Sequence, residues 1–213
     1  MQGRTSKRDH HELATKTIGL AILPRPSGAN ICPVSNLIEI LSNFTRERIP
    51  LVTGGTLRVF ESDVRVRFCG VEHRSGNNVA SRILRYIKMQ MRMTQRIAES
   101  SHIDTWIFFT GGETLALAMI MAKLFHKRTI IVLSAHIITD MVSTSNRFVT
   151  PIKILIMVTL RFCERIVVYS PRLITEWNLE KYRHKILIAH RHFLDFNTFT
   201  VTTPLPDRPP LIG

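Results

Sequence analysis

Glycine, serine and threonine follow almost every short apolar run of this 213-residue sequence, at positions where backbone and hydroxyl groups could hold an anion. The clusters are Pro26-Ser27-Gly28, Thr53-Gly54-Gly55, Gly70, Thr110-Gly111-Gly112-Glu113, Ser134-Ala135-His136 and Ser170. Glycine allows a ligand to approach the backbone closely, and a helix that starts after such a cluster offers unpaired N–H groups to a phosphate. Turns need the same residues in any α/β protein, so no single cluster identifies a ligand.

A row of five basic residues is the second group that could bind an anion. They are Arg82, Arg85, Lys88, Arg92 and Arg96. Spacings of three and four residues place them on one face of a helix, along about 21 Å. We expect the buried side to consist of Ile83, Leu84, Ile87, Met91 and Ile97, with Tyr86, Met89 and Met93 bordering the charges. Such a face suits an anionic membrane, although a solvated face over an apolar core explains the row equally well.

Motifs for metals and common nucleotides are missing from the sequence. No GxGxxG follows the first apolar run, and there is no GxxxxGK[ST]. We interpret neither pair of histidines as a metal site, because His10 and His11 lie in the polar tail and His190 and His192 flank Arg191 in a turn. We therefore expect no metal and no cofactor, and we interpret Asp195 as a turn residue.

Alternation of apolar, β-branched runs with helical segments predicts an α/β fold with a Rossmann-like, doubly wound, mostly parallel sheet. The predicted strands are Thr17–Leu23, Ile49–Val52, Val64–Cys69, Thr105–Phe109, Thr129–Leu133, Arg165–Tyr169 and Lys185–Ile188. The predicted helices are Pro33–Phe44, a segment from a cap at Asn77 or Asn78 to Ser100, Glu113–Phe125, Pro151–Cys163, and a short one at Pro171 after a Ser170 cap. In such a sheet all the polar clusters lie along one carboxyl edge.

The composition narrows the class of partner. A formal net charge of +13 calls for a polyanion, such as a nucleic acid, an acidic membrane or a phosphorylated small molecule. Nucleic acid ranks second to a membrane surface, because the sequence has no RRM, KH, OB or zinc-finger signature and no interleaving of basic with aromatic residues. The longest apolar run, Ile152–Leu160, is about half the length that spans a bilayer. Three distant cysteines, Cys32, Cys69 and Cys163, fit a reducing compartment, so we expect a cytoplasmic protein. The basic row adds the expectation of a peripheral contact with the cytoplasmic face of a membrane.

The last third of the chain carries a resemblance to a known family. It rests on Ile166-Val-Val-Tyr-Ser-Pro-Arg-Leu-Ile-Thr-Glu-Trp177, Lys185-Ile-Leu-Ile-Ala-His190 and Asp195-Phe-Asn-Thr-Phe199. This order of strand, serine, short helix, strand and turn aspartate resembles the amino-terminal domain of family 4 GT-B glycosyltransferases, which are retaining and use nucleotide-sugars. The resemblance extends back to about Thr17. It departs from the family at residues 189–195, where an Asn-Gly pair is absent.

The resemblance implies a domain on the acceptor side of a glycosyltransferase that moves a sugar from a nucleotide-sugar donor to an acceptor, such as a lipid-linked one at a membrane surface. Ser27 and Gly28 would approach the donor diphosphate through backbone N–H groups. His136 would be the catalytic residue beside the transferring sugar. The acceptor side would include Gly111, Gly112 and Glu113. His136 could instead cap a helix, and Glu113 could simply favour a helix dipole.

The resemblance also divides the chain. We expect a polar tail at residues 1–16, the acceptor-side domain at 17–200, and a proline-rich connection at 201–213. In the family this connection leads to the donor-binding domain and its acidic EX7E motif. We expect the chain, whether a fragment, a truncated product or a separate subunit, to be inactive without that half. The alternative is a non-catalytic binding module, or a remnant, that recognises a sugar, a lipid headgroup or a partner protein.

Overall fold

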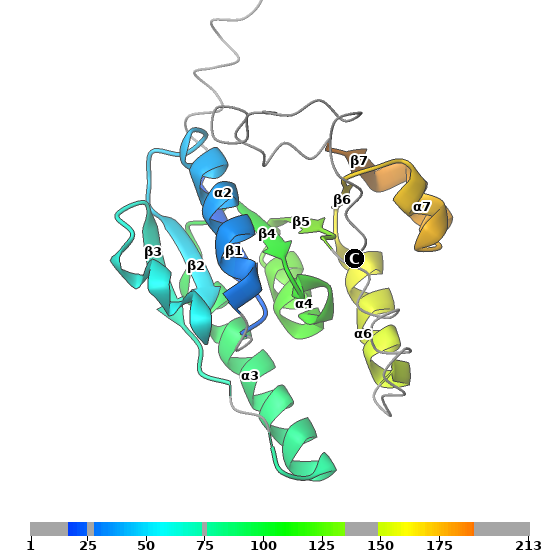
Figure 1. Cartoon of the computed structure of the whole chain (residues 1–213), viewed down its shortest axis with the longest axis horizontal. Coiled ribbons are helices and arrows are strands. Elements are labelled where there is room, and N and C mark those ends of the chain that lie inside the picture. The colour runs from blue at the N-terminus through cyan, green and yellow to red at the C-terminus, as the bar shows by residue number, and fades with distance from the viewer. Residues whose placement is uncertain (1–16, 25–27, 74–75, 135–148, 190–213) are drawn as a thin grey trace, which may run out of the picture.

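The computed structural model describes residues 17–24, 28–73, 76–134 and 149–189. Seven strands form one parallel sheet in the order β3-β2-β1-β4-β5-β6-β7 (Figure 1). They are β1 (Ile18–Ile22), β2 (Ile49–Thr53), β3 (Val66–Gly70), β4 (Thr105–Phe109), β5 (Arg128–Val132), β6 (Arg165–Val168) and β7 (Ile186–Ile188). The predicted fold class is confirmed, and all seven predicted strands are present.

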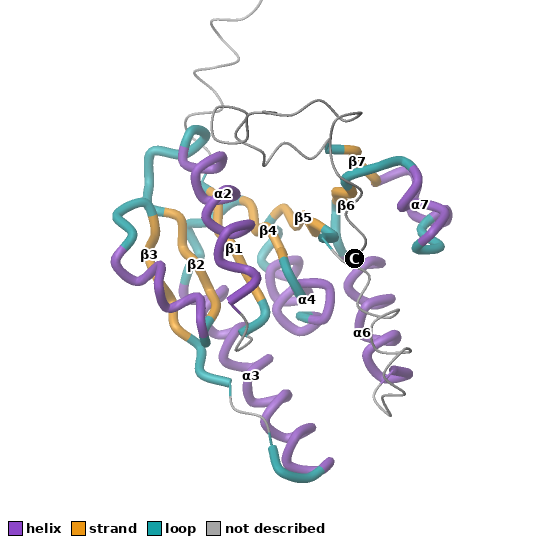
Figure 2. Tube along the Cα trace, in the orientation of Figure 1, coloured by secondary structure: helices purple, strands orange, loops and turns teal. Residues whose placement is uncertain are grey.

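Five α-helices connect the strands in the described part of the chain (Figure 2). They are α2 (Ile31–Ser42), α3 (Val79–Glu99), α4 (Ala116–Leu124), α6 (Val149–Phe162) and α7 (Arg172–Glu176). Asn78 caps α3 as predicted, because its side chain accepts a hydrogen bond from the Ser81 N–H. The predicted start of α4 is wrong. Gly112–Thr114 form a short 3₁₀ turn, so Glu113 precedes the α-helix.

Helices cover both faces of the sheet, and the side chains of β1 alternate between them. Leu20 and Ile22 pack into a cluster with Val34 and Ile38 of α2. Ala21 belongs to a second cluster on the opposite face, which includes buried residues of α3, α4 and α6. The middle strands β2 and β4 are buried along their whole length, as expected for parallel strands that are covered on both faces.

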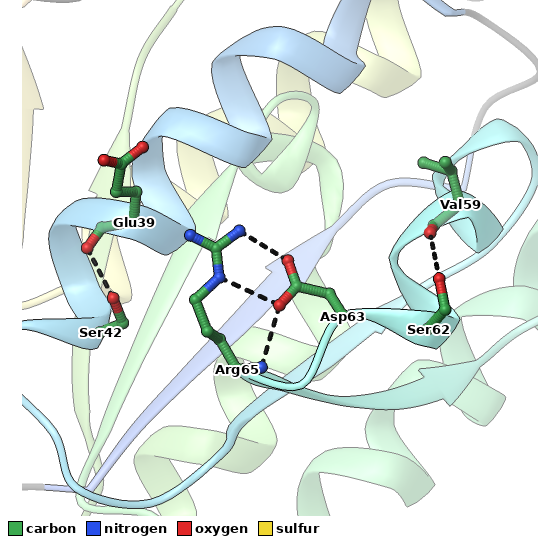
Figure 3. A network of polar contacts seen from close by, with 6 residues as sticks. All are labelled: Glu39, Ser42, Val59, Ser62, Asp63 and Arg65. Atoms are coloured by element: carbon green, nitrogen blue, oxygen red, sulfur yellow. Dashed lines mark hydrogen bonds and ion pairs between the residues drawn. The ribbon is translucent and has the colours of Figure 1, made fainter.

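A charged turn fixes the chain as it enters β3. Asp63 accepts hydrogen bonds from the backbone N–H and the Nε of Arg65 at 2.9 and 3.0 Å, and its second oxygen lies 2.7 Å from an Arg65 terminal nitrogen (Figure 3). The hydrogen bonds from the Arg65 side chain lower the pKa of Asp63. The pair precedes β3 and therefore lies at the amino edge of the sheet, away from the polar clusters that follow the strands. We interpret it as structural.

A buried lysine closes the end of α6. Lys185 Nζ donates to the carbonyl oxygens of Arg161 and Cys163 at 3.0 and 3.1 Å, and it stands 5.2 Å from the centre of the Tyr182 ring. The Arg161 carbonyl belongs to the last turn of α6 and the Cys163 carbonyl directly follows the helix, where backbone carbonyls have no intrahelical donor. The cation is also favourable at the negative end of the helix dipole.

The thiol of Cys163 gives this region a measurable pH dependence. Burial raises the pKa of Cys163 from 9.0 to about 11. Above pH 9 the unfolded chain therefore releases a proton that the folded chain retains, so the stability present below pH 9 is lost as the pH rises toward 11. We expect Cys163 to contribute a loss on the order of 2 kcal/mol across this window.

Urea unfolding at several pH values tests this prediction. The free energy of unfolding should fall less between pH 9 and pH 11 in Cys163→Ala than in the parent chain. An unchanged slope would contradict the prediction, and Cys32→Ala, which alters an exposed cysteine, serves as the control.

Candidate functional site at the carboxyl edge

The order of the strands reverses between β1 and β4, at the centre of the sheet. β1 and β4 are neighbours, but the chain leaves β1 toward α2 on one face and leaves β4 toward α4 on the other. The loops that follow these two strands therefore diverge. In open parallel sheets, ligands bind in the crevice beyond the carboxyl ends of such strands. The described residues of the polar clusters, such as Thr53–Gly55 and Thr110–Glu113, share one edge as predicted, because every described strand pair is parallel.

The turn after β4 has an unusual backbone. Thr110 and Gly111 have φ values of 40° and 80°, both in the left-handed region. A β-branched residue in this region costs about 1–3 kcal/mol. Gly112 follows where a Cβ atom would lie 2.8 Å from the Cβ of Phe108. The Thr114 hydroxyl donates to the Gly111 carbonyl at 2.8 Å and so closes the turn. The fold maintains this strained conformation at the edge where α/β sheets bind ligands.

Two side chains of α3 fix this turn from outside. Tyr86 Oη donates to the Thr114 carbonyl at 2.6 Å, and Gln90 Nε2 lies 2.7 Å from the same oxygen and 2.7 Å from Tyr86 Oη. Gln90 is buried, and its Oε1 has no hydrogen-bond partner. Glu113, between these contacts and Gly112, is only 4% exposed. A buried carboxylate requires compensating polar groups, so we interpret the burial of the Glu113 side chain as a specific feature of this turn.

A second close approach joins the ends of β2 and β3. The Val71 N–H donates to the Thr53 carbonyl at 2.7 Å. A Cβ atom on Gly54 would lie 2.0 Å from the Val71 carbonyl oxygen, and Gly55 has a φ of 65°. Thr53 is fully buried, and its hydroxyl has no partner. The glycines predicted here are therefore required by the backbone, which does not by itself indicate a ligand.

His73, which the sequence reasoning missed, lies beyond β3 on the same edge. Its Nδ1 is buried and has no hydrogen-bond partner. Burial and, to a lesser extent, the charge of Arg85 lower the pKa of His73, so the imidazole is neutral at pH 7. A neutral imidazole offers one donor and one acceptor to a hydroxyl group. A single histidine in a loop carries no motif, so only the fold could reveal this position.

The structure describes part of the predicted donor loop. Gly28 begins a short 3₁₀ turn, Gly28–Asn30, that leads directly into α2. Asn30 makes no side-chain capping hydrogen bond at this helix start, and Pro33 in the first turn has no N–H to offer. Ser27 and His136 lie outside the described residues, as do His10, His11, His190, His192 and Asp195. Within the described ranges, no group of three potential ligands could hold a metal ion.

The predicted orientation of α3 is wrong. Its buried residues are Met89, Gln90, Met93 and Ile97. Four of the five residues predicted to be buried are exposed, namely Ile83, Leu84, Ile87 and Met91. The reason is the contact with the turn after β4, because Tyr86 and Gln90 must point toward Thr114. The basic residues Arg82, Arg85, Lys88, Arg92 and Arg96 are exposed as predicted.

Comparison with known proteins identifies the fold. No protein-family profile and no curated protein sequence matches the chain. Among solved structures, HepE of Anabaena in complex with UDP and glucose matches with a TM-score of 0.58 and 12% identity, over 86% of this chain and 46% of that one. MurG of Acinetobacter baumannii matches with 0.51 and 7%, over 83% and 45%. The UDP-GlcNAc 2-epimerase of Methanocaldococcus jannaschii matches with 0.51 and 12%, over 81% and 45%.

These matches show a shared architecture. The chain has the Rossmann-like α/β fold of GT-B-type proteins, as the resemblance implied. It spans slightly less than half the length of each of these three structures.

Proposed function

We propose that this chain is the acceptor-side half of a glycosyltransferase that takes a sugar from a nucleotide-sugar, with the donor bound mainly by a second half. The observation that carries the proposal is the position of the strained Thr110–Thr114 turn, which follows β4 where the strand order reverses between β1 and β4. The partial coverage of the matched structures, two of which are named for UDP or a UDP-sugar, supports a second half. Family 4 membership and retention at the anomeric carbon belong to the same proposal.

Each part of the edge has a role in this proposal. The start of α2, after Gly28, offers N–H groups to the donor diphosphate, and its dipole favours the negative charge of the leaving nucleotide. The Gly111–Glu113 turn and His73 offer hydrogen-bonding groups to acceptor hydroxyls. His136 remains the proposed catalytic residue beside the transferring sugar, and Ser27 the companion of Gly28. No cofactor and no metal enters the proposed reaction.

The acceptor is proposed to be lipid-linked and to be reached at the cytoplasmic surface of a membrane. The support comes from the net charge of +13 and from the exposed basic row on α3, which begins beyond the same carboxyl edge. Anionic headgroups attract basic side chains near the surface, at about 1 kcal/mol each. An acceptor with a lipid anchor would therefore be presented next to the edge that binds its sugar or phosphate.

The test is a transfer assay with a panel of UDP-sugars and both a polyprenyl phosphate and a soluble sugar acceptor. This chain should be inactive alone and active with a donor-binding half. Glu113→Gln should lower kcat/KM for the acceptor by about 10- to 100-fold, since hydrogen bonds to charged groups contribute roughly 1.5–3 kcal/mol. The KM for the donor should change little.

Glu61→Gln is the matched control, because Glu61 is 64% exposed and lies before β3, at the amino edge. A thermal melt of Glu113→Gln separates a loss of function from a loss of fold. Transfer by the isolated chain would overturn the half-enzyme proposal. Absence of transfer in every combination would favour a non-catalytic binding module.

A further inference from the structure

We infer that the amino-terminal half of α3 inserts a row of apolar side chains into an anionic lipid surface and holds the carboxyl edge of the sheet toward it. We name this the insertion row: Ile83, Leu84, Ile87 and Met91. The inference goes beyond the proposed contact of the basic residues with headgroups. It rests on the proposed function only in explaining why the carboxyl edge should face a membrane.

The insertion row lies on a side of α3 that no other part of the described structure covers. Leu84 and Met91 are 68% and 63% exposed, and Ile83 and Ile87 are close to half exposed. Four apolar side chains exposed to this degree within nine residues are unusual on a surface in contact only with water. The helix does not need them for its core, because Met89, Met93 and Ile97 supply its buried side.

The helix has three distinct sides. At about 100° per residue, the centre of the insertion row lies about 145° from that of the basic row and about 120° from that of the buried residues, and the basic row lies about 95° from the buried residues. The outward direction therefore falls between the apolar and the basic side chains. A helix that lies on a bilayer with this side down places its apolar residues among the acyl chains and its basic residues among the headgroups.

The insertion row also lies at one end of the helix. The 21 residues of α3 span about 31 Å, whereas a five-residue strand spans roughly 17 Å. None of the residues 79–88 is buried, and the first buried residue is Met89. The amino-terminal part of α3 thus extends past the strands at the carboxyl edge (Figure 1). Insertion of this end of α3 brings the carboxyl edge of the sheet, and not the opposite side of the domain, to the lipid surface.

Charge selects an anionic surface as the partner. Arg82 donates to the Gly76 carbonyl at 3.1 Å, and Arg96 forms a 2.8 Å ion pair with Glu99. Among the described residues, no acidic side chain lies within ion-pair distance of Lys88 or Arg92. These two cations flank the insertion row along the middle of the helix. None of the helices in the described ranges has the length and apolar character that a bilayer span requires.

Co-sedimentation of the full chain with vesicles tests the inference. The chain should bind vesicles of phosphatidylcholine with phosphatidylglycerol and should not bind phosphatidylcholine alone. The double variant Leu84→Ser with Met91→Ser should lower the partition coefficient on the order of 10-fold or more. Lys88→Gln with Arg92→Gln should lower it on the order of 10- to 30-fold, and added salt should weaken binding of the parent chain.

A matched control removes exposed apolar residues elsewhere. Val64 and Leu124 are 75% and 66% exposed, and both lie near the amino edge. Val64→Ser with Leu124→Ser should leave vesicle binding unchanged. Equal loss in this control, binding that ignores lipid charge, or no binding at all would overturn the inference. Self-association of the chain without lipid, abolished by the Leu84 and Met91 changes, would also overturn it in favour of a second copy as the occupant.

The orientation has its own readout. A tryptophan introduced as Ile87→Trp should be quenched by brominated acyl chains, whereas one introduced as Leu124→Trp should not. The reverse pattern would refute the proposed orientation even if binding occurred. Because the transfer assay includes a soluble acceptor, failure of the membrane contact and failure of the proposed function give different results.

Discussion

Gly54→Ala should lower the free energy of unfolding by about 3 kcal/mol, the upper part of the range for overpacked interiors. The added Cβ would meet the Val71 carbonyl oxygen at 2.0 Å, and this oxygen belongs to the backbone rather than to a side chain that could rotate away. Relief requires that the ends of β2 and β3 separate, which strains the hydrogen bond between the Val71 N–H and the Thr53 carbonyl. Urea unfolding followed by circular dichroism measures the loss.

Gly70→Ala is the control for this prediction. Gly70 lies at the end of the neighbouring strand β3, but its Cβ would meet only the edge of the Phe68 ring, at 3.1 Å. A small movement of this ring removes the contact, so we expect a loss below about 1 kcal/mol. Equal stabilities for the two variants would show that β2 and β3 do not approach as closely as described.

The second large effect concerns the centre of the sheet. Trp106 of β4 is fully buried, and Trp106→Ala should cost about 3–5 kcal/mol because it leaves a large cavity. Its six-membered ring covers Gly19 of β1, where an added Cβ would lie 2.7 Å from two ring atoms. Gly19→Ala should therefore cost about 1–3 kcal/mol through overpacking.

The two positions should be strongly coupled. In a Trp106→Leu background the ring is absent, so Gly19→Ala should become nearly neutral, and the double-mutant cycle should give a coupling energy of at least about 1 kcal/mol. Additive losses would contradict the packing of the ring on Gly19. The cycle isolates this contact from the general cost of changing a core tryptophan.

The sequence was sufficient to locate the central strands β2 and β4 because both are buried along their whole length. Continuous apolar runs such as Thr105–Phe109 are typical of covered parallel strands and are easily located. Helix starts were also predictable where a local hydrogen bond fixes them, as at Asn78. The residues after Glu113 favour a helix, but the left-handed backbone at Thr110 and Gly111 delays the helix start to Ala116.

The face of α3 could not be predicted for a different reason. The helix has two apolar sides, and periodicity does not indicate which of them packs against the rest of the domain. The choice depends on Gln90, a polar residue buried by its hydrogen bonds to Tyr86 and to the Thr114 carbonyl, which lies 24 residues further along the chain. His73 could not be predicted for the same reason, because the burial of its Nδ1 depends on tertiary contacts.

The sheet order has a consequence for the synthesis of this protein. The central pair joins Ile18 to Thr105, and Thr17 donates to the Asp104 carboxylate across 87 residues of chain. At roughly 5–20 residues per second, on the order of 4–17 s pass between translation of β1 and of β4. During this time β1, the most apolar strand of the amino-terminal part, lacks β4, its neighbour at the centre of the sheet. We therefore expect the nascent chain to need protection from aggregation until β4 has left the ribosome.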